Sequence, residues 1–188
     1  MKLIKKVNIL IVGLGLLGGS YAKGLKKLGF EVNAITKDKT SVEYALENDI
    51  IDYGTTKIEP EIIKKADLVI FALYPHIFVD WVKENQQYFK SGAVLTDVTG
   101  VKGCIVEEIQ GFLRDDVEYI AAHPMAGKEV SGVENSDDGI FKGANYIVVP
   151  TEKNSKEAIE LCANLGELLG FRKVSILGVK EHDEMIAF

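Results

Sequence analysis

Short runs of consecutive apolar residues alternate along the chain with segments in which apolar residues recur every three or four positions. The continuous runs predict strands buried on both faces of a parallel sheet. They are Val7–Val12, Val32–Ile35, Leu68–Leu73, Ala93–Thr96, Tyr119–Ala122, Tyr146–Val149 and Lys173–Ile176. The periodic segments predict helices over Leu16–Leu28, Thr40–Glu47, Pro60–Lys65, Ile77–Phe89, Val101–Leu113 and Lys156–Leu169. This alternation predicts the α/β class, with a doubly wound and mostly parallel sheet.

Two stretches depart from the alternation. Asn135–Gly143 is polar and contains glycine, so we expect a surface excursion there. Gly178–Phe188 begins a helical pattern and stops without a cap or a polar tail. We therefore expect residues 1–176 to form one domain, and residues 177–188 to be the start of a C-terminal helix of a second domain that continues beyond this sequence.

The first apolar run has two possible meanings. Lysines at positions 2, 5 and 6 precede it, a combination that also occurs in secretion signals. Glycines follow at positions 13, 15, 18 and 19, and glycine weakens any continuous helix. The glycines favour a strand that turns directly into a helix.

The glycines fit the pattern G-x-G-x-x-G in "GLGLLG", between a predicted strand and a predicted helix. Gly13 permits a tight turn, Gly15 lets the backbone approach a pyrophosphate, and Gly18 lets helix and strand pack closely. The first helical amides, which include those of Leu16 and Leu17, then face the anion at the positive end of the helix dipole. The sequence therefore predicts a Rossmann-type NAD(P) site, which we expect Leu73 and Thr99 to line from neighbouring strand ends.

The end of the second strand bears on the choice of cofactor. An acidic residue there would bind the ribose 2′-hydroxyl of NAD, but Thr36 and Lys37 occupy the place. A hydroxyl and an ammonium suit the 2′-phosphate of NADP, so NADP is preferred over NAD. Asp38 would be the ribose-binding acid if the strand ran two residues longer.

Composition narrows the class of protein. The 188 residues carry a net charge of −6, which argues against a general nucleic-acid-binding surface. No stretch is long and apolar enough to suggest a membrane span. The two cysteines form no CxxC pair and no cluster with histidines, so we expect no metal site and a reduced, cytoplasmic protein.

His123 is the candidate for chemistry among the three histidines. It follows a predicted strand, at the place where α/β sheets bind ligands, and lies in "AAHPMAGKEVSG". The proline and the Ala126-Gly127 pair after it suggest a constrained loop. His76 is expected to be a surface residue at a helix start, and His182 lies in the terminal segment beside Asp183.

Four motifs together resemble the prephenate/arogenate dehydrogenase family of tyrosine biosynthesis. They are "GLGLLGGS", "TDVTGVKG", "HPMAGKEVSG" and "EHDEMIAF", in this order. The resemblance implies an NAD(P)-dependent oxidative decarboxylation of prephenate to 4-hydroxyphenylpyruvate. It also implies a nucleotide-binding domain followed by a helical dimerisation domain, and hence a homodimer.

The resemblance also implies residue roles. His123 corresponds to the histidine that hydrogen-bonds the substrate 4-hydroxyl and accepts its proton, and Lys102 would reach the cofactor or the substrate carboxylate unless it is a surface lysine. Gly100 replaces a serine that often assists the histidine, so we expect water or Thr99 to assist instead. The family's carboxylate-binding arginines lie mainly in the helical domain, so this chain alone should bind dinucleotide and turn over poorly.

Three alternatives stay open. Arogenate is an alternative substrate to prephenate. A β-hydroxyacid dehydrogenase shares the glycine pattern but uses a lysine from its helical part and has no evident use for "HPMAG". A domain that only senses NAD(P) would not need His123.

Overall fold

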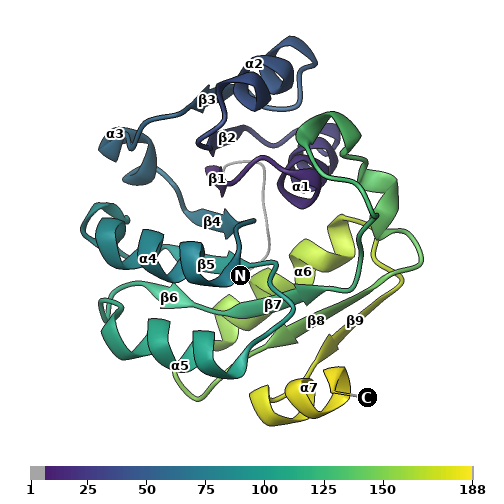
Figure 1. Ribbon diagram of the computed structural model, residues 1–188. Coiled ribbons are helices and arrows are strands. Elements are labelled where there is room, and N and C mark those ends of the chain that lie inside the picture. The colour runs from purple at the N-terminus through teal and green to yellow at the C-terminus, as the bar shows by residue number, and fades with distance from the viewer. Residues whose placement is uncertain (1–6, 188) are drawn as a thin grey trace.

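The computed structural model describes residues 7–187, in which two sheets lie side by side (Figure 1). The larger sheet is parallel, with six strands in the order β3-β2-β1-β4-β5-β6 among these residues. Its strands are β1 (Ile9–Val12), β2 (Val32–Ile35), β3 (Tyr53–Thr55), β4 (Leu68–Phe71), β5 (Val94–Asp97) and β6 (Glu118–Tyr119). The strand order reverses between β1 and β4, which places a crevice at their carboxyl ends.

The helices cover both faces of the large sheet (Figure 1). They are α1 (Leu16–Lys27), α2 (Lys39–Glu47), α3 (Pro60–Ile63), α4 (Pro75–Asn85), α5 (Gly103–Phe112), α6 (Lys156–Leu168) and α7 (Val179–Ile186), with a 3₁₀ turn η1 (Gln86–Tyr88) after α4. In β1, Ile9 and Ile11 pack in the core shared with α1 and α6, whereas Leu10 and Val12 pack in the core shared with α4 and α5. Both faces are therefore buried, which explains the uninterrupted apolar run. The predicted α/β class and Rossmann-type arrangement are confirmed.

The predicted strand Tyr119–Ala122 is wrong as a single element. Its first part is β6, and the second part begins a smaller sheet of β7 (Ala121–Pro124), β8 (Asn145–Val149) and β9 (Lys173–Ile176). The Ile120 amide donates to the Leu95 carbonyl at 3.0 Å, after which β7 pairs antiparallel with β8. Both parts are buried, so the apolar pattern carries no mark of the division. The short edge strand β3, which is polar and partly exposed, was not predicted.

The expected surface excursion over Asn135–Gly143 is also wrong. This part of the chain forms 3₁₀ turns η2 (Val133–Asn135) and η3 (Asp138–Phe141), which pack against α1. Phe141 is fully buried, stacks on Phe171 at a centroid distance of 4.6 Å and meets Tyr21 edge-on at 5.1 Å. A single aromatic residue in a polar segment thus anchors it, because burying one ring contributes a few kcal/mol, on the order of 3.

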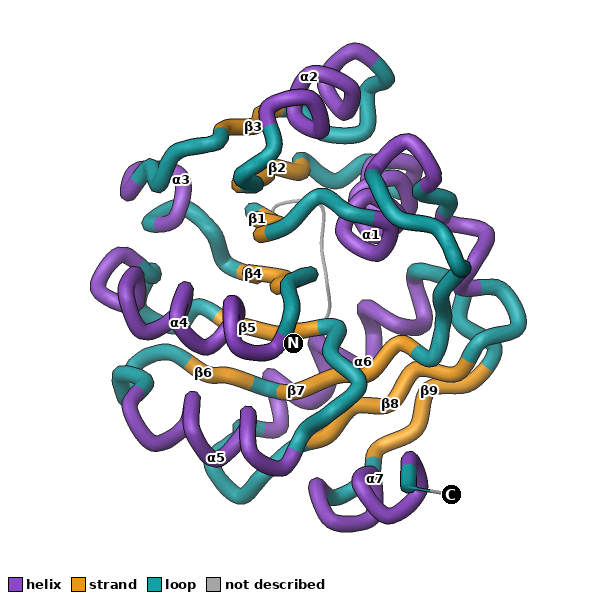
Figure 2. The backbone as a smooth tube through the Cα atoms, in the orientation of Figure 1, coloured by secondary structure: helices purple, strands orange, loops and turns teal. Residues whose placement is uncertain are grey.

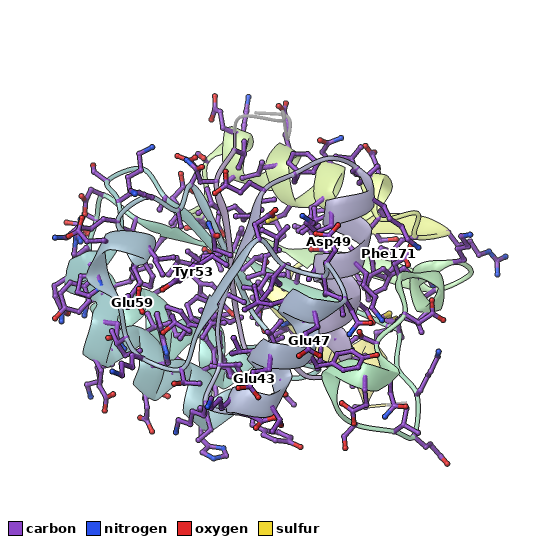
Figure 3. All side chains as sticks on the ribbon, turned by 90° about the horizontal axis from the view of Figure 1, so that it is seen from above. Glu43, Glu47, Asp49, Tyr53, Glu59 and Phe171 are labelled. Carbon is purple, nitrogen blue, oxygen red and sulfur yellow. The ribbon has the colours of Figure 1, made fainter. Side chains whose placement is uncertain are left out.

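The loops that follow β1, β4 and β5 lie at the same edge of the sheet (Figure 2). Beside the outer strand β3, the Tyr53 hydroxyl donates to Glu59 at 3.0 Å, and both side chains are labelled in Figure 3. None of the helices described is long and apolar enough to cross a membrane.

Candidate functional site: a nucleotide cleft beside a histidine pair

A cleft of about 610 Å³ lies at the carboxyl ends of β1, β4 and β5. Most of the predicted cofactor residues line it: Gly13, Gly15, Leu16, Leu17, Gly18, Thr36, Leu73 and Thr99. A second cavity of about 470 Å³ shares Thr36 and Leu73 with the cleft and is lined by Lys37 as well. The two cavities therefore adjoin at the end of β2.

The first turn is built for an anion. Gly13 has a φ of +97°, which favours glycine, and its amide donates to the Ile35 carbonyl at 2.8 Å. A Cβ on Gly18 would overlap the Gly13 carbonyl oxygen, whereas a Cβ on Gly15 would meet nothing within 4 Å. Gly15 caps α1 and the first turn holds no acidic residue, so amides at the helix start are available to a ligand. These residues fit a dinucleotide diphosphate.

The end of β2 bears the residues expected to read the ribose. β2 ends at Ile35, Thr36 is half-buried, and Lys37 is exposed with no ion pair to any residue in 7–187. The Asp38 carboxylate caps α2, accepting from the amides of Thr40 and Ser41 at 3.2 and 3.1 Å. Hydrogen bonds from the Ser41 and Thr40 side chains lower the pKa of Asp38. Asp38 is thus engaged by its own helix and also lines the cleft, although the strand ends at Ile35 and does not run two residues longer.

A buried ion pair supports the loop after β5. Asp97 and Lys102 are both fully buried, and the Lys102 ammonium donates to Asp97 Oδ2 at 2.7 Å. Asp97 Oδ1 accepts from the Tyr119 hydroxyl at 3.0 Å and from the Ala122 amide at 3.2 Å. Asp97 Oδ2 also accepts from the amide and the hydroxyl of Thr99. A charge pair with this many partners fixes the loop instead of serving as a free charge.

This arrangement corrects two predicted contacts. Lys102 is neither a surface lysine nor a cleft residue, because its ammonium lies in the ion pair; burial lowers its pKa, and Asp97 opposes the shift. The Thr99 hydroxyl contacts Asp97 and Lys102 Nζ and is not within hydrogen-bond distance of His123. Thr99 lines the cleft, but it does not assist the histidine through its hydroxyl.

His123 lies on β7, half-buried beside the cleft. A Cβ on the cleft residue Gly100 would lie 3.6 Å from His123 Nε2, so that nitrogen faces the cleft at position 100. Burial, with help from the Lys102 charge, lowers the pKa of His123 to about 4. His123 is therefore neutral at pH 7 and able to accept a proton.

The sequence did not reveal the partner of His123. His123 Nδ1 lies 2.9 Å from His182 Nε2, and His182, on α7, is fully buried. The sequence showed His182 in the "EHD" of the terminal segment, but the hydrophobic pattern did not predict where that segment packs in the fold. The loop after β7 also contributes Gly127, Lys128 and Ser131 to the cleft.

A family model described as "Prephenate dehydrogenase, nucleotide-binding domain" matches residues 21–175. The chain belongs to the prephenate dehydrogenase family. A prephenate dehydrogenase of Lactococcus lactis is 36% identical over 181 residues, which are 95% of this chain and 48% of that protein. One of Bacillus subtilis is 29% identical over 162 residues, 85% of this chain and 44% of that protein. The chain thus spans about half the length of these relatives.

Solved structures agree with this membership. Prephenate dehydrogenase from Aquifex aeolicus, in complex with hydroxyphenyl propionate and NAD⁺, superposes with a TM-score of 0.89 at 31% identity. The match covers 98% of this chain and 64% of that one. Membership in the prephenate dehydrogenase family confirms the predicted resemblance, and the matched model confirms a nucleotide-binding domain. This membership counts against the β-hydroxyacid dehydrogenase alternative.

Proposed function

We propose that this chain is the nucleotide-binding part of a cytoplasmic enzyme that oxidatively decarboxylates prephenate to 4-hydroxyphenylpyruvate for tyrosine biosynthesis. The observation that carries the proposal is the placement of a neutral His123, whose Nε2 faces the nucleotide cleft at Gly100. A domain that only sensed NAD(P) would have no use for a base in this position. Residues 177–188, which include α7, would begin the helical domain.

In this mechanism His123 handles one proton while other bonds change. The nicotinamide supplies the acceptor for the hydride that leaves substrate C4. His123 Nε2 accepts the 4-hydroxyl proton as that oxygen becomes a carbonyl. When the ring carboxylate leaves as CO₂, its bonding electrons make the ring aromatic and the proton returns to the oxygen. Aromatisation supplies the driving force, so the protein chiefly orients the reactants.

Gly100 leaves space beside this base. No side chain at position 100 contacts His123 Nε2, and the Thr99 hydroxyl belongs to the buried ion pair. We propose that water assists His123 here. The space accommodates a serine Cβ at an ordinary van der Waals distance, so Gly100→Ser should keep dinucleotide affinity unchanged.

We propose NADP as the preferred cofactor, with Thr36 and Lys37 near its 2′-phosphate. The support is the half-buried Thr36, the exposed Lys37 and the engagement of Asp38 in the cap of α2. An exposed ion pair contributes up to about 1 kcal/mol. Lys37→Ala should therefore weaken NADP binding about five-fold in calorimetric titrations and leave NAD binding unchanged. Lys173→Ala, an exposed lysine on β9, is the matched control; an equal loss for both cofactors would refute the preference.

The activity is tested on the natural full-length protein with prephenate and arogenate as separate substrates, following reduced nicotinamide. We expect prephenate to support the faster reaction, and His123→Asn to lower kcat by at least about 100-fold, because a base contributes on this order. A faster reaction with arogenate would make arogenate, and not prephenate, the substrate of the enzyme. Full activity of His123→Asn would remove the proposed mechanism.

We propose that the full-length protein is a homodimer. The support is on α7, where Met185 and Ile186 are 40% and 39% exposed, as expected of a helix whose apolar side packs on further chain. The cytoplasm is supported by Cys104 and Cys162, which are both free. A monomer in light scattering of the full-length protein would contradict the dimer.

A further inference from the structure

We infer that His182 is a positioning residue, which holds His123 in the tautomer protonated on Nδ1 so that its bare Nε2 faces the cleft. The tautomer follows from side-chain contacts in the structure, while its catalytic use rests on the proposed function. The relevant groups come from three elements: His123 from β7, His182 and Asp183 from α7, and the Gly103 amide from the start of α5.

The Asp183 carboxylate determines which nitrogen of His182 carries a hydrogen. His182 Nδ1 lies 3.0 Å from Asp183 Oδ1, and an ionised carboxylate only accepts hydrogen bonds. His182 Nδ1 must therefore carry a hydrogen. In neutral His182 the other ring nitrogen, Nε2, is then an acceptor.

The contact between His182 and His123 then determines which nitrogen of His123 carries a hydrogen. His182 Nε2 lies 2.9 Å from His123 Nδ1, and the two rings meet at 67° with centroids 5.2 Å apart. Since His182 Nε2 accepts, His123 Nδ1 must donate. His123 Nε2 is consequently left without a hydrogen, which is the form that a proton acceptor requires.

The start of α5 holds the Asp183 carboxylate in place. The Gly103 amide donates to Asp183 Oδ2 at 3.0 Å, at the positive end of the α5 dipole. A Cβ on Gly103 would lie 2.7 Å from Asp183 Oδ2, so a side chain there would displace the carboxylate. The side chain of His182 is fully buried, and among residues 7–187 its ring nitrogens lie within hydrogen-bond distance of His123 and Asp183 alone.

Burial and the surrounding charges keep His123 neutral at neutral pH. The Lys102 charge disfavours a positive charge on His123, and Asp97 favours it more weakly. Burial has the largest effect, and together these lower the pKa of His123 to about 4. His123 is neutral over the physiological range, so the side on which it holds its single hydrogen determines whether it can act as a base.

The tautomer can be read directly on the chain with ¹⁵N-labelled histidine, from two-bond ¹H–¹⁵N correlations of the imidazoles at pH 7. Three histidines give three patterns, assigned with single variants. We expect protonated Nδ1 for both His123 and His182. A His123 ring protonated on Nε2, or a His182 ring protonated on both nitrogens that donates to His123, would overturn the inference.

The catalytic consequence is tested with three variants of the full-length enzyme. His182→Leu removes the acceptor, so we expect kcat to fall about 100-fold with KM and NADP affinity nearly unchanged. His182→Gln offers a carbonyl oxygen to His123 Nδ1 and should restore much of kcat. His76→Leu, at an exposed histidine of α4, is the matched control. Equal activity of His182→Leu and wild type would overturn the positioning role.

The two proposals fail differently. If the full-length wild type oxidised neither prephenate nor arogenate while His123 showed protonated Nδ1, the proposed function would fall and the tautomer would stand. If the wild type were active with His123 protonated on Nε2, the proposed function would stand and the tautomer would fall. Should His182→Leu unfold, the spectrum of the wild-type chain still decides the tautomer.

Discussion

Two glycines of the first turn should respond differently to the same substitution, because alanine at Gly18 should cost stability and alanine at Gly15 should not. A Cβ on Gly18 would overlap the Gly13 carbonyl oxygen and lie 3.0 Å from its carbonyl carbon and 3.2 Å from Ala72 Cβ. Gly13 cannot retreat easily, because its amide donates to the Ile35 carbonyl at 2.8 Å in the next strand. Gly18→Ala must therefore separate α1 from the sheet. Overpacking of this kind costs about 1–3 kcal/mol, and more where backbone is displaced.

Gly15 is the matched control, since it lies in the same turn. A Cβ there would meet nothing within 4 Å, and its φ of −99° and ψ of −155° are open to alanine. Gly15→Ala should change the free energy of unfolding by less than about 1 kcal/mol. The new methyl group would occupy the space through which a diphosphate approaches the amides. Losing charge-assisted hydrogen bonds costs about 1.5–3 kcal/mol, or roughly 10- to 150-fold in Kd.

The assay combines urea unfolding without ligand and calorimetric titration with NADP. We expect Gly18→Ala to lose both stability and binding, and Gly15→Ala to lose binding alone. If Gly15→Ala bound NADP like wild type, the diphosphate would not lie over this turn. If Gly18→Ala were as stable as wild type, the close crossing of α1 over β1 would not be needed for the fold.

Three further predictions concern buried groups. Lys102→Met should destabilise the fold by about 3–5 kcal/mol in urea, because it leaves Asp97 buried and uncompensated, and adding Asp97→Asn should recover much of the loss. Because the pKa of His123 is lowered to about 4 in the folded state and lies near 6.5 when unfolded, the unfolded state binds more protons between these values. Stability should fall by about 2–3 kcal/mol as pH drops through this window, and His123→Asn should fall less; an identical pH profile would contradict this. Burial raises the pKa of Cys162 to about 12, so the thiol reagent DTNB should label Cys104 quickly in the native protein and Cys162 only in denaturant.

The features that could be predicted from sequence depend on neighbours along the chain. The turn from β1 into α1 is an example, since Gly13 and Gly18 contact each other within a few residues and the adjoining apolar run is buried on both sides. The end of β2 is similar, because Thr36 and Lys37 follow directly from the strand. In each case the local pattern specifies both the element and the side of it that faces the cleft.

The features that could not be predicted depend on contacts between distant segments. The sequence left Lys102 as either a ligand-binding residue or an exposed lysine at a helix start. Only the position of Asp97 at the end of a buried strand makes it a buried ion-pair partner. The chain between His123 and His182 includes two strands and α6, so their 2.9 Å contact is a property of the tertiary fold. Phe141 gave no periodic signal either, because one aromatic residue has no period.

The placement of α7 connects the base to the nucleotide cleft through a short series of contacts. His182 accepts from His123, Asp183 accepts from the Gly103 amide, and Gly103 begins α5 directly after the loop that contributes Thr99 and Gly100 to the cleft. A rotation of α7 away from the sheet would break the first two contacts together, and His123 would then be free to hold its hydrogen on Nε2. The nucleotide turn of α1 takes no part in these contacts. Dinucleotide binding should therefore survive a displacement of α7 that abolishes proton transfer, because the two functions are supported by different ends of the chain.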